Sequence, residues 1–327
     1  QSVVVEPLFR DPVFVVRAQL HAARSLFLAS LPCWAAAAGF LLVASPRRLS
    51  FLLAGAAAAE MLAFALSVRP TSDLSRAASP GLRRFAEEHP GDYRSLFLAD
   101  PDAAMPARLQ GLWGYGPLPP ARYARLMQAS QGAQARAATP YLDFKAWSPA
   151  FRMLRGRFLF ADRVVEFPGA LPRLQLVRRV EVAGGPDEAL RKVLAPGFDP
   201  ARTVVLESAP SPAPDPSAAF RPGERARVLE SGTDFLDVEA DLEAPAVLLV
   251  TDDYDPSWRA AALPGSAGRR YDVLPADYTL RAVPLPAGRH LFRMEYSPAG
   301  FRIGRWVSFV SAAGFLLAAG WAARRAP

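Results

Sequence analysis

Three long apolar stretches stand out along the 327 residues of the chain. They cover residues 25–44, 49–67 and 304–323, and the only charged side chains within them are Glu60 and Arg305. A helix needs about 20 mostly apolar residues to cross the hydrocarbon core of a bilayer. We therefore expect three transmembrane helices, with the first two joined as a tight hairpin through Ser45-Pro46-Arg47-Arg48.

A strand pattern precedes the third apolar stretch. Residues 236–242 alternate between apolar and acidic side chains, as in a strand with one buried face, whereas residues 247–250 are all apolar, as in a buried strand. Turn formers such as Asp255-Pro256 and Pro264-Gly265 separate these runs from later ones, the last of which covers residues 291–296. The pattern predicts a small antiparallel β-sandwich-like unit that leads directly into the third helix.

Helix and strand signals are mixed between the hairpin and this β unit. Ser79-Pro80 predicts the start of a helix, because Pro is favoured at the first helical position, and His89-Pro90 predicts its end. A second helix is expected to stop at Gly156, before a strand. Further strands are expected at residues 93–98, 158–160, 174–182 and 204–207, and further helices at residues 121–127 and 186–194.

These patterns predict a membrane α-helical protein with about three transmembrane helices and an extracytoplasmic α+β region that ends in the antiparallel β-sandwich-like unit. Residues 208–221 are rich in Pro, Ala and Ser, which is typical of a linker or a long loop. The expected parts are a lead-in segment that is either an interfacial helix or the end of an outer loop (1–24), a transmembrane hairpin (25–67), a mixed α/β region (68–207), a Pro-rich linker with a first strand (208–235), a β-rich unit (236–303) and a C-terminal transmembrane helix with a basic tail (304–327).

The charges indicate the orientation of these parts. Cytoplasmic loops are typically rich in Arg and Lys, which favours the cytoplasm for Arg47-Arg48 and Arg324-Arg325 and the outer side for residues 68–301. The net charge is +7, but no basic stripe with interleaved aromatic residues is present, so we do not expect nucleic-acid binding. Cys33 is the only cysteine and can form no intrachain disulfide. Because the chain begins at Gln1 without a Met or a signal peptide, we expect it to be part of a longer protein.

The acidic run Asp252-Asp253-Tyr254-Asp255 is the most conspicuous candidate for chemistry. It lacks the alternating ligands and distal Glu of an EF-hand, which favours a strand-end turn whose Asp side chains bind nearby amides, with a metal or sugar contact as the alternative. Tyr254 and Trp258 could stack on a sugar ring or pack under the turn. Glu60 lies within an apolar stretch, where a carboxylate is costly, and has either a functional or a structural role there.

Other catalytic signatures are not found in the sequence. His21, His89 and His290 are far apart and do not have metal-ligand spacing, so we expect ordinary surface or turn residues. Neither a nucleophile elbow nor a phosphate-binding loop is present. We therefore expect no metal site, cofactor or catalytic residue within this chain.

Three segments of the chain carry a family resemblance. They are residues 248–258 (LLVTDDYDPSW), 281–290 (RAVPLPAGRH) and 296–304 (YSPAGFRIG), and together they resemble the C-terminal region of YfhO-like bacterial membrane proteins. Ser257 stands where that family usually has Gly. Residues 114–123 (GYGPLPPARY) are similar to a further family motif, with Gly116 in place of a common acidic residue.

This resemblance implies a function. YfhO-like proteins look like GT-C-type glycosyltransferases, which take sugar from a polyprenyl-phosphate donor, so the resemblance implies transfer to a cell-envelope acceptor and a catalytic loop outside this chain. It also implies missing N-terminal transmembrane helices as partners, and location in the bacterial cytoplasmic membrane. Candidate sugar or acceptor contacts are Tyr254, Trp258, Asp253, Tyr115 and Arg122. The alternative is a non-catalytic, membrane-anchored binding or assembly module.

Overall fold

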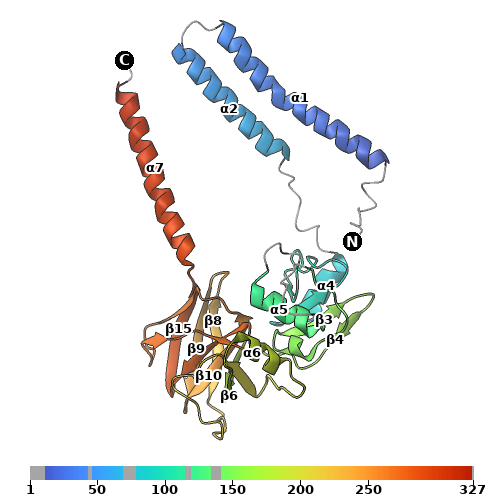
Figure 1. Ribbon diagram of the computed structural model, residues 1–327, viewed down its shortest axis with the longest axis vertical. Helices are drawn as coiled ribbons and strands as arrows, with labels where there is room; N and C mark the ends of the chain where they lie inside the picture. The colour runs from blue at the N-terminus through green and yellow to red at the C-terminus, as the bar shows by residue number, and fades with distance from the viewer. Residues whose placement is uncertain are drawn as a thin grey trace. The chain divides into compact units, whose positions relative to one another are not determined.

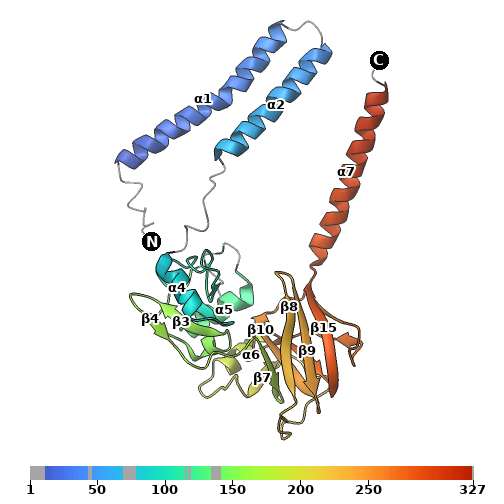
Figure 2. The same ribbon diagram turned by 180° about the vertical axis from the view of Figure 1, so that it is seen from behind.

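The computed structural model describes residues 12–42, 46–68, 79–114, 116, 119–133 and 141–325. The chain forms two compact units, residues 1–77 and 78–327. In the first unit, helices α1 (Pro12–Leu42) and α2 (Pro46–Val68) run side by side in opposite directions (Figures 1 and 2). The other described elements belong to the second unit, which is mostly β-sheet.

The prediction of about three transmembrane helices is wrong. Among the described residues, one segment is long and apolar enough to cross a membrane, namely Ala299–Trp321 of helix α7 (Ala299–Arg325). This segment has a mean hydropathy of 1.4, and none of its residues is buried. The described residues therefore do not support a multi-pass membrane protein.

The two N-terminal helices differ from the predicted spans for physical reasons. The apolar part of α2, Ser50–Leu66, is shorter than the roughly 20 residues that a crossing helix needs, and it contains Glu60. Helix α1 begins at Pro12 and carries Arg17 and Arg24, so the charge-free run is only one part of a longer, partly charged helix.

Three sheets form most of the second unit. A four-stranded sheet, in the order β2-β1-β3-β4, is parallel except for β4. A six-stranded mixed sheet has the order β5-β10-β14-β13-β7-β6, and a five-stranded antiparallel sheet has the order β12-β11-β15-β9-β8. The strands are β1 (Arg94–Phe97), β2 (Gln110–Gly111), β3 (Gly156–Phe160), β4 (Val164–Glu166), β5 (Leu174–Val177), β6 (Arg179–Val182), β7 (Thr203–Leu206), β8 (Arg225–Ser231), β9 (Phe235–Leu242), β10 (Ala246–Asp253), β11 (Trp258–Ala262), β12 (Arg270–Tyr271), β13 (Leu274–Ala276), β14 (Leu280–Leu285) and β15 (Gly288–Tyr296).

Strand β10 lies between two hydrophobic cores, which explains its wholly apolar sequence. Because side chains alternate along a strand, Leu248 and Val250 point into the core between the six-stranded and five-stranded sheets. Val247 and Leu249 point into the core on the opposite face. Residues 236–242 are a strand as predicted, and their apolar members Leu236, Val238 and Ala240 complete the first core.

Short helices cover the second core. They are α5 (Ala121–Ser130), the 3-10 turn η2 (Pro149–Arg152) and α6 (Pro186–Val193). Helix α4 (Pro80–Glu88) instead packs the ring of Phe85 against Phe158 and Phe160 of β3. The predicted start of α4 is confirmed, since the Ser79 hydroxyl accepts a hydrogen bond from the amide of Leu82 at 3.2 Å and Pro80 occupies the first turn. The predicted helices at residues 121–127 and 186–194 are also confirmed, as α5 and α6.

Residues 174–182 were expected to be one strand, but the structure divides them at Arg178. The segment before Arg178 is β5 and the segment after it is β6, and these strands lie at opposite edges of the six-stranded sheet. Arg178 is buried and donates to the carboxylate of Glu224 and to the carbonyl of Ala219, the latter at 2.8 Å. An alternating pattern cannot reveal such a break, because its cause lies more than 40 residues away in sequence.

Gly156 was expected to end a helix through its own conformational freedom. The left-handed residue is instead Arg155, with φ of 63°, and Gly156 is the first residue of β3. A side chain at position 156 would lie 2.9 Å from the carbonyl oxygen of Phe151, so close packing requires glycine there. The preceding helix is only the short turn η2.

Candidate functional site

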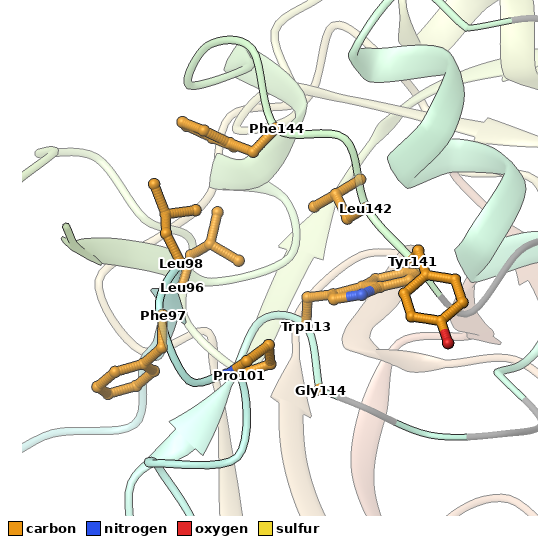
Figure 3. A pocket seen from close by; sticks show the side chains of 9 residues that line it. All are labelled: Leu96, Phe97, Leu98, Pro101, Trp113, Gly114, Tyr141, Leu142 and Phe144. Carbon is orange, nitrogen blue, oxygen red and sulfur yellow. The ribbon is translucent and has the colours of Figure 1, made fainter. Parts of the chain in front are cut away.

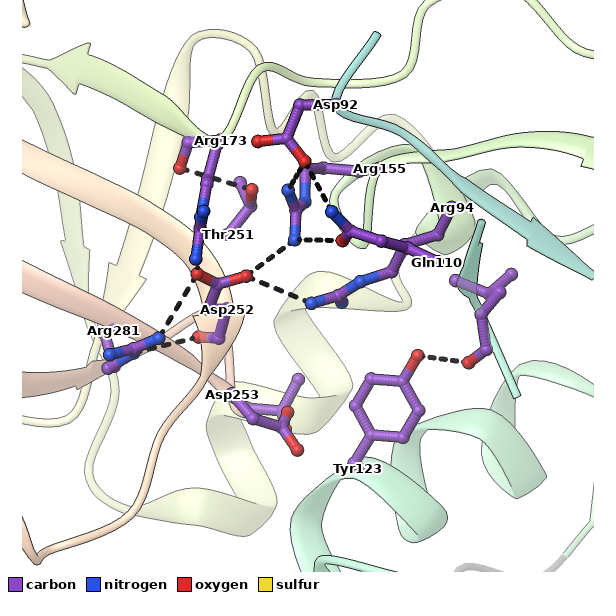
Figure 4. A network of polar contacts seen from close by, with 12 residues as sticks. Asp92, Arg94, Gln110, Tyr123, Arg155, Arg173, Thr251, Asp252, Asp253 and Arg281 are labelled. Atoms are coloured by element: carbon purple, nitrogen blue, oxygen red, sulfur yellow. Dashed lines mark hydrogen bonds and ion pairs between the residues drawn. The ribbon is translucent and has the colours of Figure 1, made fainter. Parts of the chain in front are cut away.

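The candidate site is built around the end of strand β10. The register between β10 and β14 shifts between Val250 and Asp253, so Thr251 and Asp252 form a bulge. A bulge commonly redirects a side chain, and here the buried carboxylate of Asp252 lies among residues from several segments (Figure 4). The Thr251 hydroxyl donates to the carbonyl of Pro172 at 3.1 Å and helps to fix the bulge.

Four arginines surround Asp252. Its Oδ1 atom is 3.1 Å from Nη2 of Arg94 and 2.6 Å from Nη2 of Arg155. Its Oδ2 atom is 2.8 Å from Nε of Arg173 and 3.3 Å from Nη2 of Arg281. These arginines come from β1, the residue just before β3, the loop before β5, and β14, so a single carboxylate joins the four-stranded sheet to the six-stranded sheet (Figure 4).

Burial and charge act in opposite directions on this cluster. Burial favours the neutral form of Asp252, but the four guanidinium groups outweigh it and lower the pKa of the carboxyl. Burial also lowers the pKa of Arg155 and of Arg281 to about 10, so both remain charged at neutral pH. Arg155 has a second partner in Asp92, and its Nη2 atom donates to the side chain of Gln110 at 3.2 Å.

A cleft of about 570 Å³ opens beside this cluster. Its wall includes Arg94, Gln110 and Asp253 as polar groups, with Trp113 and Tyr123 as aromatic ones. Volumes of about 300–1,000 Å³ are usual for small-molecule sites. Of the predicted contact residues that the structure describes, Asp253 is therefore the one that lines the cleft. We call this hollow the Asp253 cleft.

Asp253 is the carboxyl of the cleft whose pKa is strongly shifted by its surroundings. Burial raises the pKa of its carboxyl to about 6, although the Thr279 hydroxyl, which donates to Oδ1 at 2.8 Å, favours the charged form. Tyr123 stands near it in Figure 4 and donates its hydroxyl proton to the carbonyl of Leu112. Burial raises the pKa of Tyr123 to about 12, so this hydroxyl stays protonated.

Arg122 and Tyr254, two further predicted contacts, lie together beside a strained turn. The turn contains Asp277 and Tyr278, whose φ angles of 43° and 69° are unusual for residues other than glycine. Arg122 donates to the carbonyl of Tyr278 at 2.9 Å and pairs with Glu207, and its guanidinium lies over the Tyr254 ring at 5.7 Å. These contacts hold Arg122 in place as a structural cation.

Trp258 lies under Arg281 rather than in the cleft. The guanidinium carbon of Arg281 is 3.8 Å from the centre of the Trp258 ring, and the Tyr296 ring is 5.5 Å away. At that distance a cation–π contact stabilises the buried guanidinium of Arg281. Of the two expected uses of Trp258, packing under the turn is the one that the contacts describe.

The aspartates of the acidic run have different bonding partners. Asp255 accepts a hydrogen bond from the amide of Ser257 at 2.7 Å, as predicted for a strand-end turn. Asp252 and Asp253 instead bind side chains from distant strands. Among the described residues, no group of three or more His, Cys, Asp or Glu side chains is placed to hold a metal ion.

Three further residues were considered in the sequence, namely Tyr115, Glu60 and His290. Tyr115 lies outside the described residues, and Glu60 is a half-buried residue of α2 in the first unit. The expectation for His290 is wrong, because its side chain is fully buried, with Nδ1 2.9 Å from the hydroxyl of Tyr271 and Nε2 2.9 Å from the carbonyl oxygen of Pro286. The carbonyl can only accept, so His290 donates from Nε2 and Tyr271 donates to Nδ1.

Sequence reasoning missed the arginines around Asp252. They are spread from position 94 to position 281, and no local motif connects them. The one usable signal was Asp252 itself, since a carboxylate that follows a wholly buried strand needs a cationic partner. Comparison of the chain with protein-family models, curated proteins and solved structures finds no match.

Proposed function

We propose that this chain binds an uncharged, polyhydroxylated ligand of the carbohydrate class in the Asp253 cleft. The observation that carries the proposal is the composition of the cleft, which combines the N–H donors of Arg94 and Gln110 with the carboxylate of Asp253. These side chains also bind Asp252, Asp92 and Thr279, which fixes their positions. Trp113 and Tyr123, whose stacked rings have centroids 6.1 Å apart, add apolar surface to the lining of the cleft. Because Asp102 also lines the cleft, its charges are of both signs, which favours a neutral ligand.

Substitution of Asp253 by asparagine tests this proposal. The full chain in lipid nanodiscs is screened on a glycan microarray, and affinities for the bound glycans are measured by titration calorimetry at pH 7.5. Loss of a charged acceptor in a buried site costs about 1.5–3 kcal/mol, so we expect binding to weaken by about tenfold or more. Asp241→Asn, on strand β9 of the five-stranded sheet, is the matched control and should bind as the wild type does.

The pH dependence of binding gives a second readout of the same residue. The pKa of Asp253 is raised to about 6, so its carboxylate is ionised at pH 7.5 and gains a proton as the pH falls below about 6. Wild-type affinity should therefore fall through that range, and the asparagine variant should show no such step. Equal affinities of wild type and variant at every pH would refute the assignment of the cleft.

We propose sugar transfer at the outer face of the cytoplasmic membrane as a second, wider function. It is supported by the three segments that resemble YfhO-like proteins. They lie in order on β10–β11, β14–β15 and β15–α7, all within the sandwich that the six-stranded and five-stranded sheets form. It is also supported by α7, a helix long and apolar enough to anchor that sandwich in a bilayer. The donor would be a polyprenyl-phosphate sugar, and the catalytic acid would come from outside this chain.

Membrane vesicles of defined orientation test the wider function. Vesicles that contain the complete gene product receive a radiolabelled polyprenyl-phosphate sugar and envelope glycan that cannot cross the membrane. We expect transfer in right-side-out vesicles and none in inverted ones. Transfer only in inverted vesicles would contradict the orientation, and glycan binding without transfer in either would leave the anchored binding module as the function.

A further inference from the structure

A second, apolar hollow lies next to the Asp253 cleft. It has a volume of about 130 Å³ and includes Leu96, Leu98, Leu142 and Phe144 in its lining (Figure 3). Aliphatic and aromatic side chains dominate this lining, so the hollow favours hydrocarbon over water. We call it the Leu142 cavity.

The Leu142 cavity and the Asp253 cleft have a common boundary. Trp113 and Gly114 line both hollows. Gly114 places no side chain at this boundary, and a methyl group added there would have one neighbour within 4 Å, Oδ1 of Asp102 at 3.4 Å. A substituent that enters the cavity from the cleft would therefore cross the boundary beside Gly114, where there is no side chain.

We infer that the ligand of the Asp253 cleft carries a short, uncharged alkyl or acyl substituent that enters the Leu142 cavity. This inference rests on the function proposed above. An apolar cavity of about 150 Å³ is known to take a benzene molecule, so a hollow of about 130 Å³ takes roughly four or five carbon atoms. The polar cleft would select the sugar, and the cavity would select its substituent.

A series of alkyl glycosides tests the inference. The full chain in nanodiscs is titrated with methyl, ethyl, butyl and hexyl glycosides of glucose, galactose and mannose, with empty nanodiscs as the control for partition into lipid. Each buried methylene should increase affinity by about fourfold, up to about four carbons, after which the gain should stop. A flat series on a sugar that binds would overturn the inference alone, whereas no binding by any glycoside would refute the proposed function and the inference with it.

Two cavity variants sharpen the test. Leu142→Ala removes three carbon atoms from the lining, so the chain length at which the gain stops should increase by about three carbons. Leu142→Trp fills the cavity from a residue that does not line the Asp253 cleft, so it should bind the methyl glycoside like the wild type and lose the gain from longer chains. Leu229→Ala, at an exposed position on β8, is the matched control. If the limiting chain length stays the same in Leu142→Ala with its unfolding midpoint retained, the substituent does not enter this cavity.

Discussion

Replacing Asp252 by alanine is expected to lower the free energy of unfolding of the second unit by about 3–5 kcal/mol. The substitution removes the carboxylate that four arginines share and leaves Arg155 and Arg281, which are almost fully buried, without it. A buried charge that loses its partner cannot regain the hydration that it had in the unfolded chain. Because the cluster joins two sheets, contacts between those sheets should weaken together.

Urea unfolding followed by tryptophan fluorescence measures this effect. Asp241→Ala is the matched control, since Asp241 is more exposed and its nearest arginine nitrogen, Nε of Arg225, is 3.7 Å away. The free energy of unfolding of the control should fall by no more than about 1 kcal/mol. A loss of similar size in the Asp252 variant would show that the four-arginine cluster contributes little to stability.

The stability that Asp252 contributes should also depend on pH. The pKa of Asp252 is lower in the folded protein than its ordinary value, so the unfolded chain takes up the proton first as the pH falls. The contribution is therefore complete above the ordinary pKa and is lost as the pH falls toward the lowered one. The difference in stability between wild type and Asp252→Ala should shrink in acid.

Substitution of Glu224 by glutamine should release the Pro-rich loop and lower the free energy of unfolding by about 3 kcal/mol. Burial opposes ionisation of Glu224, but hydrogen bonds from the amides of Arg221, Glu243 and Ala244 and from the Arg178 side chain outweigh it and lower the pKa to about 2. Arg178 is almost fully buried against this carboxylate and would keep only carbonyl partners. Residues 208–221 are thus held at one end by a buried ion pair and are not a free linker.

Limited chymotrypsin digestion under native conditions measures the release of this loop. Cleavage after Phe220 should be much faster in Glu224→Gln than in the wild type. Glu243→Gln is the control, because Glu243 pairs with the exposed side chain of Arg221 and its loss should matter little. Equal cleavage rates in wild type and Glu224→Gln would mean that other contacts hold the loop.

The sequence predicted individual elements better than their arrangement. The alternation in residues 236–242 and the apolar run in residues 247–250 identified β9 and β10, because each pattern reflects which faces of a strand are covered. Apolar composition alone was a poor guide to membrane spans. It did not account for the charged first half of α1 or for the shortness of the apolar part of α2.

The site was less predictable than the strands. Asp253, Tyr254 and Arg122 were chosen from the sequence, but of these three only Asp253 lines the cleft. The reason is the bulge in β10, which no local sequence pattern predicts. The arginines could not be found, because charge pairing acts through space, here between Asp252 and residues 29 to 158 positions away in the sequence. Burial of His290 was missed for the same reason, since its partner Tyr271 belongs to another strand.

The direct passage from β15 into α7 has a mechanical consequence. Strand β15 is central in the five-stranded sheet and is bonded along its length to β9 on one side and to β11 on the other. A pull on α7 along the strand would load these two rows of hydrogen bonds in shear, so that they share the force instead of breaking one after another. The five-stranded sheet should therefore resist unfolding under a force that is applied through α7.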